Sequence, residues 1–485
     1  MDRSIAEGPD GPLSPQPGAG RLAAVVVGLL LAFGALALYT WSNPEHYNQY
    51  NHFVWQADAF LHGKVSFDWP VPDGADRPPN WYFNDIYPLF DASGQPTGQV
   101  LLPFPPLPAL VLLPFVAAIG LRVDQEAIAV VLAAVGVGVA WWMLGGLRIR
   151  LAVRALATVL FATGTVWWWA AAVGSTWYFA HIVAVIFALL AVGVALRHDP
   201  RAETAPVRHD APDDPGGGWR AALWPLDRSQ VLAGLLLGIA ATARLPLVFG
   251  APFLILVGGG GTRARRLVSA AAGGVLPVAA LLLYTPLTTG SWLHPGYDYQ
   301  YQLEANGYPT LGYHADWSVE DLRYIPQNLG IMFGALPVVA PDIKPNTLGF
   351  GDPVVLCASL DAQRSLFDLD CPLVMPIDIG TSILLSAPGL LIALFAVRRH
   401  PLARLTVGVG VTVVVIALFN LAHFSQGWVQ WGYRFSLDFI PFLLPLVALG
   451  AGHADGRPRG IAVALVIAGA AINLWGVAWG QLLGW

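Results

Sequence analysis

The sequence predicts an all-α polytopic membrane protein of about 11 transmembrane helices, with two large extracytoplasmic loops that contain juxtamembrane helices. Three observations predict this fold class. Hydrophobic residues make up 55% of the 485 residues and charged residues only 12%, whereas about a quarter of a soluble domain is charged. Apolar runs of about 17–25 residues, long enough to cross the ~30 Å hydrocarbon core, recur along the chain. The third observation is the distribution of charge.

Acidic residues and arginines gather in different connections. Residues 42–100 and 288–380 hold 18 of the 31 acidic residues but only 5 of the 26 Lys and Arg. Arginines gather instead in short connectors at 148–154, 262–266, 398–404 and 456–460. The positive-inside rule therefore predicts a multi-pass plasma-membrane protein with a cytoplasmic N-terminus, cytoplasmic arginine connectors and both acidic loops outside.

The elements follow in order from the apolar runs. Residues 1–20 are rich in Pro and Gly and are expected to form a disordered cytoplasmic tail. The first apolar run is expected to be an anchor rather than a signal peptide, because no small-residue cleavage site accompanies it. Residues 21–485 then form a single membrane domain, with expected spans near 21–41, 125–147, 152–171, 177–196, 229–243, 245–258, 266–287, 381–397, 404–423, 435–452 and 459–481.

Three segments between these spans need a separate interpretation. The first extracytoplasmic loop, 42–124, contains the Pro-rich apolar segment 103–120. A regular span there would invert the later loops, so we expect an amphipathic or re-entrant helix against the outer leaflet. Residues 197–228 are charged and Pro/Gly-rich and are expected to form a flexible cytoplasmic linker. Residues 288–380 form the second extracytoplasmic loop.

A break is expected in the long apolar run 231–259, at Arg244–Leu245–Pro246. A single tilted span would bury the guanidinium group at the bilayer midplane, at a cost of about 2.5–3.5 kcal/mol. Two short helices that meet at Arg244 would place this charge on the outer side and keep 262–266 cytoplasmic. We therefore expect the second arrangement.

The two cysteines of the chain, Cys357 and Cys371, both fall in the second extracytoplasmic loop. A disulfide is allowed outside the cytoplasm, and closing a loop of this size adds roughly 3 kcal/mol to the stability. The sequence predicts this disulfide, and two unrelated thiols are the alternative.

The first loop carries the candidate catalytic groups. Its stretch HFVWQADAFLHGK has helical spacing. Asp58 on that helix, Asp85 or the neighbouring His52 could take a proton from an acceptor hydroxyl as a general base. For each acid, solvation of an exposed loop is the alternative. The side chains suited to contact a sugar or an acceptor are Tyr50, Trp55, Trp81, Tyr82, Tyr297 and Asp298.

Arginines are few at the expected outer face. Arg244, Arg323 and Arg434 fall there, and the planar donor fork of arginine suits the phosphate oxygens of a lipid carrier. For Arg434 an ion pair with Asp438, one helical turn on, is the alternative. His181 is expected to be packed or hydrogen-bonded rather than catalytic. The sequence has no metal-spaced Cys/His cluster and no nucleotide-binding motif, so no cofactor is expected, while dependence on a divalent metal stays open.

Four segments together give the chain a resemblance to a known family. They are ADAFLHG (Ala57–Gly63), PFPPLPALVLLP (Pro103–Pro114), GLLLGIAATARLP (Gly234–Pro246) and GYRFSLDFIPF (Gly432–Phe442). With them the chain resembles the GT-C superfamily of multi-spanning glycosyltransferases, which use polyprenyl-phosphate sugars. The dolichyl- or polyprenyl-phosphate-mannose transferases and their bacterial membrane homologues are the members that it resembles most.

The resemblance implies an inverting transferase with a carboxylate base in the first outer loop and basic residues on the lipid phosphate. By motif position, Arg244 is similar to the phosphate-binding basic residue of the family's mid-chain hairpin, and Arg434 is similar to its late arginine near the carrier. The chain departs from the family where many members have an acid pair ahead of the first-loop helix, because it has Tyr50–Asn51–His52 there. The base therefore stays open among the three candidates above.

The expected function is transfer of a sugar from a polyprenyl-phosphate carrier to an extracytoplasmic glycan, lipid or protein acceptor. The expected partners are the lipid-linked donor, the acceptor and membrane lipids. Nucleic acid is not expected, since the net charge is -5. One alternative is a lipid or solute transporter or flippase, against which the lack of a repeat between the two halves argues. Another is a ligase or polymerase of lipid-linked glycans.

Overall fold

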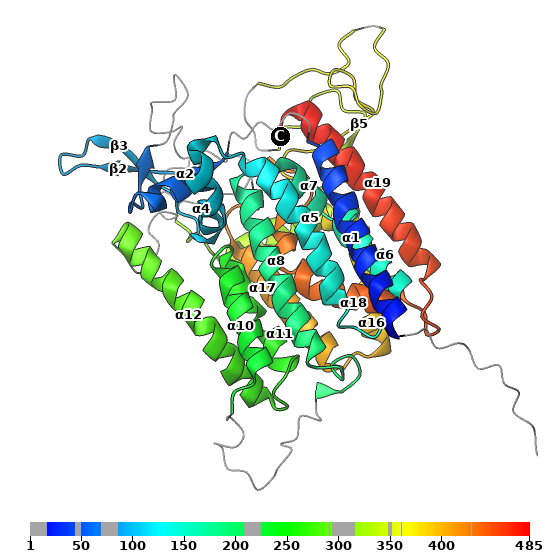
Figure 1. Ribbon diagram of the computed structural model, residues 1–485. Helices are drawn as coiled ribbons and strands as arrows, with labels where there is room; N and C mark the ends of the chain where they lie inside the picture. The colour runs from blue at the N-terminus through cyan, green and yellow to red at the C-terminus, as the bar shows by residue number, and fades with distance from the viewer. Residues whose placement is uncertain are drawn as a thin grey trace, which may run out of the picture.

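A computed structural model describes residues 17–43, 50–68, 86–207, 225–290, 292, 316–347, 352–359, 361–427 and 429–485. In this part of the chain the fold is mostly helical, and the helices lie side by side in a bundle (Figure 1). Six of the described helices are long and apolar enough to cross a membrane, or up to seven if one bent pair counts as a single span. The predicted class, an all-α membrane protein, is confirmed. The larger predicted number of crossings stays a prediction.

The first half of the bundle contains α1 (Pro17–Trp41), α5 (Gln125–Leu144), α6 (Leu151–Thr163), α7 (Trp167–Val173) and α8 (Thr176–Arg197). α6 and α7 form the bent pair, with an angle of 47° between them. The expected span 152–171 is broken here because α6 ends at Thr163 with Gly164 as its C-cap, and the Thr165 hydroxyl donates to the Phe161 carbonyl oxygen at 2.8 Å. α8 is buried over most of its length.

Small elements cover one end of this half. α2 (His52–Leu61) packs against α4 (Leu107–Ile119), which η1 (Gly120–Arg122) continues. The strands β1 (Phe67–Asp68), β3 (Pro96–Leu101) and β2 (Tyr87–Phe90) form an antiparallel sheet in that order. In the β2–β3 turn, the Asp91 carboxylate accepts hydrogen bonds from Ser93 and Gln95, which hold its pKa below the ordinary value. The helix expected within 103–120 is present as α4.

The middle of the chain forms α10 (Arg228–Ala241), the 3-10 helix η3 (Leu245–Gly250), α11 (Ala251–Leu256) and α12 (Arg263–Thr289). The expected break at Arg244 is present between α10 and η3. α10 and α12 cross closely at glycines. A Cβ on Gly234 would collide with the Ala270 carbonyl oxygen, and one on Gly273 would collide with the Val231 carbonyl oxygen. Such small-residue crossings bring helix backbones together in membranes.

The last part of the chain holds η4 (Leu322–Tyr324), α14 (Ile325–Gly334), β4 (Val338–Val339), β5 (Val374–Met375), α15 (Ile383–Ser386), η5 (Pro388–Ile392), α16 (Ala393–Arg399), α17 (Arg404–Ala422), η6 (Arg434–Asp438), α18 (Ile440–Ala451) and α19 (Gly460–Leu483). Strands β4 and β5 pair antiparallel in the second loop. The expected span 381–397 is interrupted, because Pro388 begins η5 and has no N–H group with which to continue α15.

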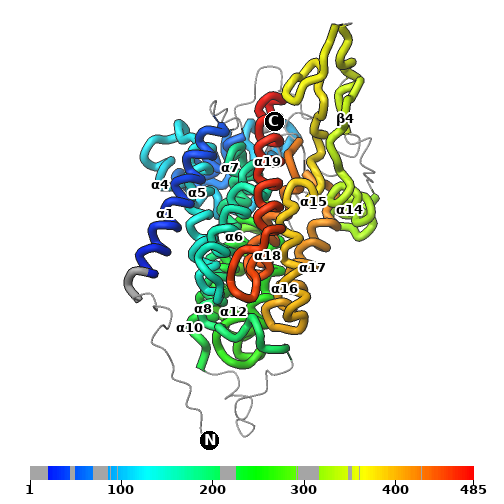
Figure 2. Tube along the Cα trace, turned by 90° about the vertical axis from the view of Figure 1, so that its right-hand side faces the viewer, coloured from blue at the N-terminus to red at the C-terminus, as the bar shows by residue number. Residues whose placement is uncertain are grey.

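The bundle has two chemically different ends (Figures 1 and 2). The loop end carries α2, the strands β2–β5 and the C-terminus. The arginine end carries the connectors 148–154, 262–266, 398–404 and 456–460. The assignment of the loop end to the outside of the cell follows from the positive-inside rule and stays a prediction.

Part of the predicted cytoplasmic linker 197–228 packs on the arginine end. The Asp199 carboxylate forms a buried ion pair with Arg404 at 2.6 Å and accepts a hydrogen bond from the Gly258 backbone N–H at 3.2 Å. A buried carboxylate requires such partners, so these contacts hold residues 198–207 against the bundle. The prediction for this segment was a flexible linker. Residues 208–224 lie outside the described residues.

Candidate functional site

The helix of the first loop, α2, is fixed between α8 and α12. At the start of α8, the Thr176 hydroxyl lies 2.7 Å from His52 Nδ1 and donates to the Tyr50 carbonyl oxygen at 2.6 Å. Further along α2, Gln56 Nε2 donates to the Tyr284 hydroxyl of α12 at 3.0 Å. These polar contacts give α2 a defined position at the loop end.

The buried carboxylate of Asp438 lies at the centre of a group of polar side chains. One of them, His181, lies one to two turns after Thr176 on α8. Asp438 is fully buried and accepts two hydrogen bonds from Arg244, from Nε to Oδ1 at 3.2 Å and from Nη2 to Oδ2 at 2.9 Å. His181 Nδ1 lies 3.2 Å from Oδ1, and Asn420 Nδ2 donates to Oδ2 at 3.1 Å. A buried charge requires such partners. These four residues are called the Asp438 cluster below.

The Phe435 ring contacts both the Asp438 cluster and Arg434. The guanidinium carbons of Arg244 and Arg434 each lie 5.3 Å from the centre of this ring. The Arg434 guanidinium also lies 5.7 Å from the centre of the Tyr178 ring and packs against Gly427, whose φ is +109°. Within the described residues, Arg434 has no carboxylate within 4.0 Å, and its Nε is buried without a hydrogen-bond partner.

The alternative for Arg434, an ion pair with Asp438, is therefore wrong. Asp438 pairs with Arg244 instead. The reason is the local helix type, because η6 is a 3-10 helix with three residues per turn. Positions i and i+4 share a face on an α-helix but not on a 3-10 helix. Arg244 already donates two hydrogen bonds to Asp438, so fewer of its donors remain for a phosphate. This weakens its predicted role as a direct phosphate ligand.

The structure describes two of the three candidate bases. His52 is fully buried and contacts Thr176, which fits a role in fixing α2. Asp58 is 32% exposed, and the Nδ1 atom of His62, one turn on, lies 3.5 Å from its carboxylate. Asp85 lies outside the described residues. Of these two side chains, His52 is buried and Asp58 is accessible to an acceptor.

Two of the six predicted sugar-contact residues are described. Tyr50 is exposed at the loop end, and its ring centre lies 5.0 Å from that of Trp177. Trp55 is half-buried and packs against the core. The other four, Trp81, Tyr82, Tyr297 and Asp298, lie outside the described residues.

Arg323, the third predicted phosphate ligand, is already paired. Its Nε and Nη2 donate to the Asp321 carboxylate at 2.9 and 2.6 Å, and its guanidinium carbon lies 4.3 Å from the centre of the Trp317 ring. The hydrogen bonds from Arg323 lower the pKa of Asp321 to about 2. The pair therefore persists at neutral pH, and Arg323 is less suited than Arg434 to bind a new anion.

Two further predictions concern the second loop and metals. The disulfide between Cys357 and Cys371 is present, as predicted. Among the described residues, no three or more His, Cys, Asp or Glu side chains are grouped so that they could hold a metal ion. Dependence on a divalent metal stays open.

Sequence reasoning missed the partners of Arg244. It placed His181 correctly in a hydrogen-bonded interior position, but it did not connect His181 or Asn420 with Asp438. A signal was present, because Arg244 and Asp438 are opposite charges in otherwise apolar segments, and charges inside a membrane commonly pair with one another. No protein-family model, curated protein or solved structure matches the chain.

Proposed function

We propose that the protein is a GT-C-type membrane glycosyltransferase, which moves a sugar from a polyprenyl-phosphate carrier to a glycan, lipid or protein acceptor outside the plasma membrane. The observation that supports this proposal best is Arg434. Within the described residues its guanidinium has no acidic partner, and the neighbouring carboxylate of Asp438 is neutralised by Arg244. The phosphate of a lipid-linked donor would supply the missing negative charge and accept hydrogen bonds from the guanidinium fork.

The Asp438 cluster has a positioning role in this proposal. Arg244 neutralises Asp438, so Asp438 neither pairs with Arg434 nor repels a bound phosphate. The helix η6 begins at Arg434 and ends at Asp438. Holding Asp438 in the interior therefore also fixes the direction from which the Arg434 side chain leaves the backbone.

Asp58 is the proposed general base. It takes the proton from an acceptor hydroxyl while that oxygen forms a bond to the anomeric carbon of the sugar. The bond from this carbon to the phosphate oxygen breaks, and its electron pair stays on the phosphate, where Arg434 stabilises the charge. Attack from the face opposite the phosphate inverts the anomeric carbon.

The proposed topology has eleven crossings, the N-terminus in the cytoplasm and both long loops outside. The six long helices and the short helix α10 would cross as single helices. Four crossings would be broken spans: α6 with α7, η3 with α11, α15 with η5 and α16, and η6 with α18. Irregular backbone is tolerated at membrane depth where other parts of the protein cover it.

The test is a transfer assay with purified protein and radiolabelled polyprenyl-phosphate mannose, glucose and arabinose. We expect consumption of one donor, and we expect Asp58→Asn to slow transfer by about 10²-fold or more while donor binding is kept. His62→Gln, a change at the exposed neighbour of Asp58, is the matched control and should stay active. Full activity of Asp58→Asn would remove Asp58 from the role of base. Consumption of a pyrophosphate-linked donor alone would indicate the ligase or polymerase instead.

The Asp438 cluster also favours a second candidate, a coupled transporter or flippase, since buried ionisable residues commonly mark ion pathways across membranes. Liposomes with a pH gradient test this candidate. Flux or lipid flipping that disappears in Asp438→Asn, together with no sugar transfer by the wild type, would replace the transferase with a transporter.

A further inference from the structure

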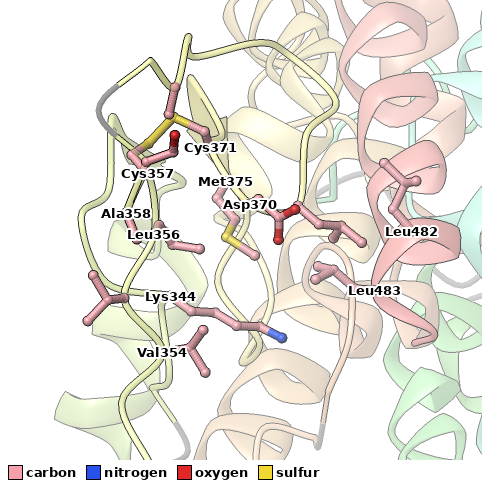
Figure 3. Close-up of a pocket in the computed structure, with 14 residues that line it drawn as sticks. Lys344, Val354, Leu356, Cys357, Ala358, Asp370, Cys371, Met375, Leu482 and Leu483 are labelled. Atoms are coloured by element: carbon pink, nitrogen blue, oxygen red, sulfur yellow. A yellow bond between two sulfur atoms is a disulfide. The ribbon is translucent and has the colours of Figure 1, made fainter.

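A cavity lies away from the proposed transfer site, where the second loop meets the end of α19 (Figure 3). Its volume is about 440 Å³, within the range of ~300–1,000 Å³ that is typical of small-molecule sites. Leu482 and Leu483 of α19 form one wall, and residues from 344–375 of the loop form the other. Neither Arg434 nor the Asp438 cluster contributes a side chain to it.

The length of α19 places this cavity at a surface of the bilayer. α19 has 24 residues, so it is about 36 Å long, whereas the hydrocarbon core is ~30 Å thick. Its last turn, with Leu482 and Leu483, therefore reaches the layer of lipid head groups. Trp475, Trp479 and Trp485 belong to the same end of the chain, and tryptophan concentrates at membrane interfaces.

The walls of the cavity are firmly attached to each other. Trp479 is fully buried, donates to the Leu366 carbonyl oxygen at 3.1 Å and belongs to one apolar cluster with Met375. The disulfide between Cys357 and Cys371 ties the loop together, and both cysteines line the cavity. The cavity is thus built from docked and cross-linked segments.

Two opposite charges reach this apolar cavity. Lys344 extends its ammonium group toward α19, and the Asp370 carboxylate lies at the same opening (Figure 3). Within the described part of the chain, neither side chain has an oppositely charged group within 4.0 Å. The lining residues Val354 and Val355 are 52% and 66% exposed, which gives the opening an apolar rim.

We propose that this cavity binds the head group of a zwitterionic phospholipid. The Lys344 ammonium would pair with the lipid phosphate, the Asp370 carboxylate with the lipid amine, and the first acyl carbons would contact Leu482, Leu483 and Met375. The pair of charges selects this class of ligand. A purely anionic head group would leave Asp370 beside like charge, and a neutral one would make no charge-assisted contact with either of these exposed side chains.

The test is native mass spectrometry of the full chain in detergent with equal amounts of phosphatidylethanolamine and phosphatidylglycerol. We expect retention of phosphatidylethanolamine over phosphatidylglycerol by about tenfold, the effect of one charge-assisted contact. Asp370→Asn should abolish this preference, and Asp370→Lys should reverse it. Lys344→Ala should reduce retention of both lipids.

The controls are Lys64→Ala and Asp316→Asn, which remove the same charges at exposed positions that do not line the cavity. They should keep the preference of the wild type. A thermal-unfolding midpoint and an intact disulfide verify that each variant is folded. Equal retention of the two lipids by the wild type would overturn the proposal. An unchanged lipid preference in folded Asp370→Asn would also overturn it, and so would unchanged retention of both lipids in folded Lys344→Ala.

Discussion

At the scale of single residues, the interior of the protein depends on the pairing of Asp438 with Arg244. The carboxylate is fully buried, whereas the Arg244 side chain is 22% exposed. Breaking a buried pair by removing one partner leaves an uncompensated charge, and this costs more than the intact pair contributes. Arg434 takes no part in this pair, so its guanidinium stays available for a phosphate while the pair fixes the position of η6.

Asp438→Ala should destabilise the protein strongly. It leaves the Arg244 guanidinium without its carboxylate, so we expect the free energy of unfolding to fall by about 3–5 kcal/mol. Reversible unfolding of the purified protein in mixed micelles measures the change. Asp361→Ala, at an exposed position of the second loop, is the control and should change the free energy by no more than about 0.5 kcal/mol.

A double substitution separates the charge effect from simple loss of contacts. Arg244→Met combined with Asp438→Leu removes both charges and keeps much of the side-chain volume, so it should be clearly more stable than Asp438→Ala alone. If the double variant is as unstable as the single one, the loss comes from packing and not from the unpaired guanidinium.

At the scale of elements, glycines decide how closely α10 and α12 approach. Gly234 faces the Ala270 carbonyl oxygen, and Gly273 faces the Val231 carbonyl oxygen. Because a Cβ at either position meets backbone, the neighbouring helix has to move as a whole to make room.

Gly234→Ala should therefore lower the free energy of unfolding by about 1–3 kcal/mol, the usual cost of overpacking. Gly34→Ala in α1 is the matched control, because a Cβ there has no neighbour within 4 Å. An alanine at that site should be neutral or stabilising by up to about 1 kcal/mol, as helix propensity predicts. Equal effects of the two substitutions would mean that the α10–α12 crossing does not depend on close backbone contact.

The positions of most elements and the break at Arg244 could be predicted from the sequence, but two other interruptions could not. Hydrophobicity placed a helix in 152–171, yet Gly164 and Thr165 bend it into α6 and α7. The same happened in 381–397, where Pro388 divides the span. A hydropathy window averages over such residues, whereas backbone hydrogen bonding depends on each of them.

At the scale of the whole molecule, the sequence predicted the membrane class, the disulfide and the clustering of arginine connectors at one end. It did not predict that Arg244 and Asp438 pair across 194 positions, because a contact between distant segments leaves no local period. The alternative that it did consider, Arg434 with Asp438, assumed an α-helix where the chain forms the 3-10 helix η6. The candidate site therefore forms only when distant segments pack together, and the sequence alone does not show which of its residues pair.

The central claim is that Arg434 binds the phosphate of a lipid-linked donor, and equilibrium binding of polyprenyl monophosphate to the purified protein tests it most directly. Arg434→Ala should weaken binding by about tenfold or more, and Arg434→Lys should fall between this variant and the wild type, since lysine keeps the charge but not the fork of donors. Arg399→Ala, at an exposed position of the arginine end, should bind like the wild type. Unchanged affinity in a folded Arg434→Ala variant would contradict the account.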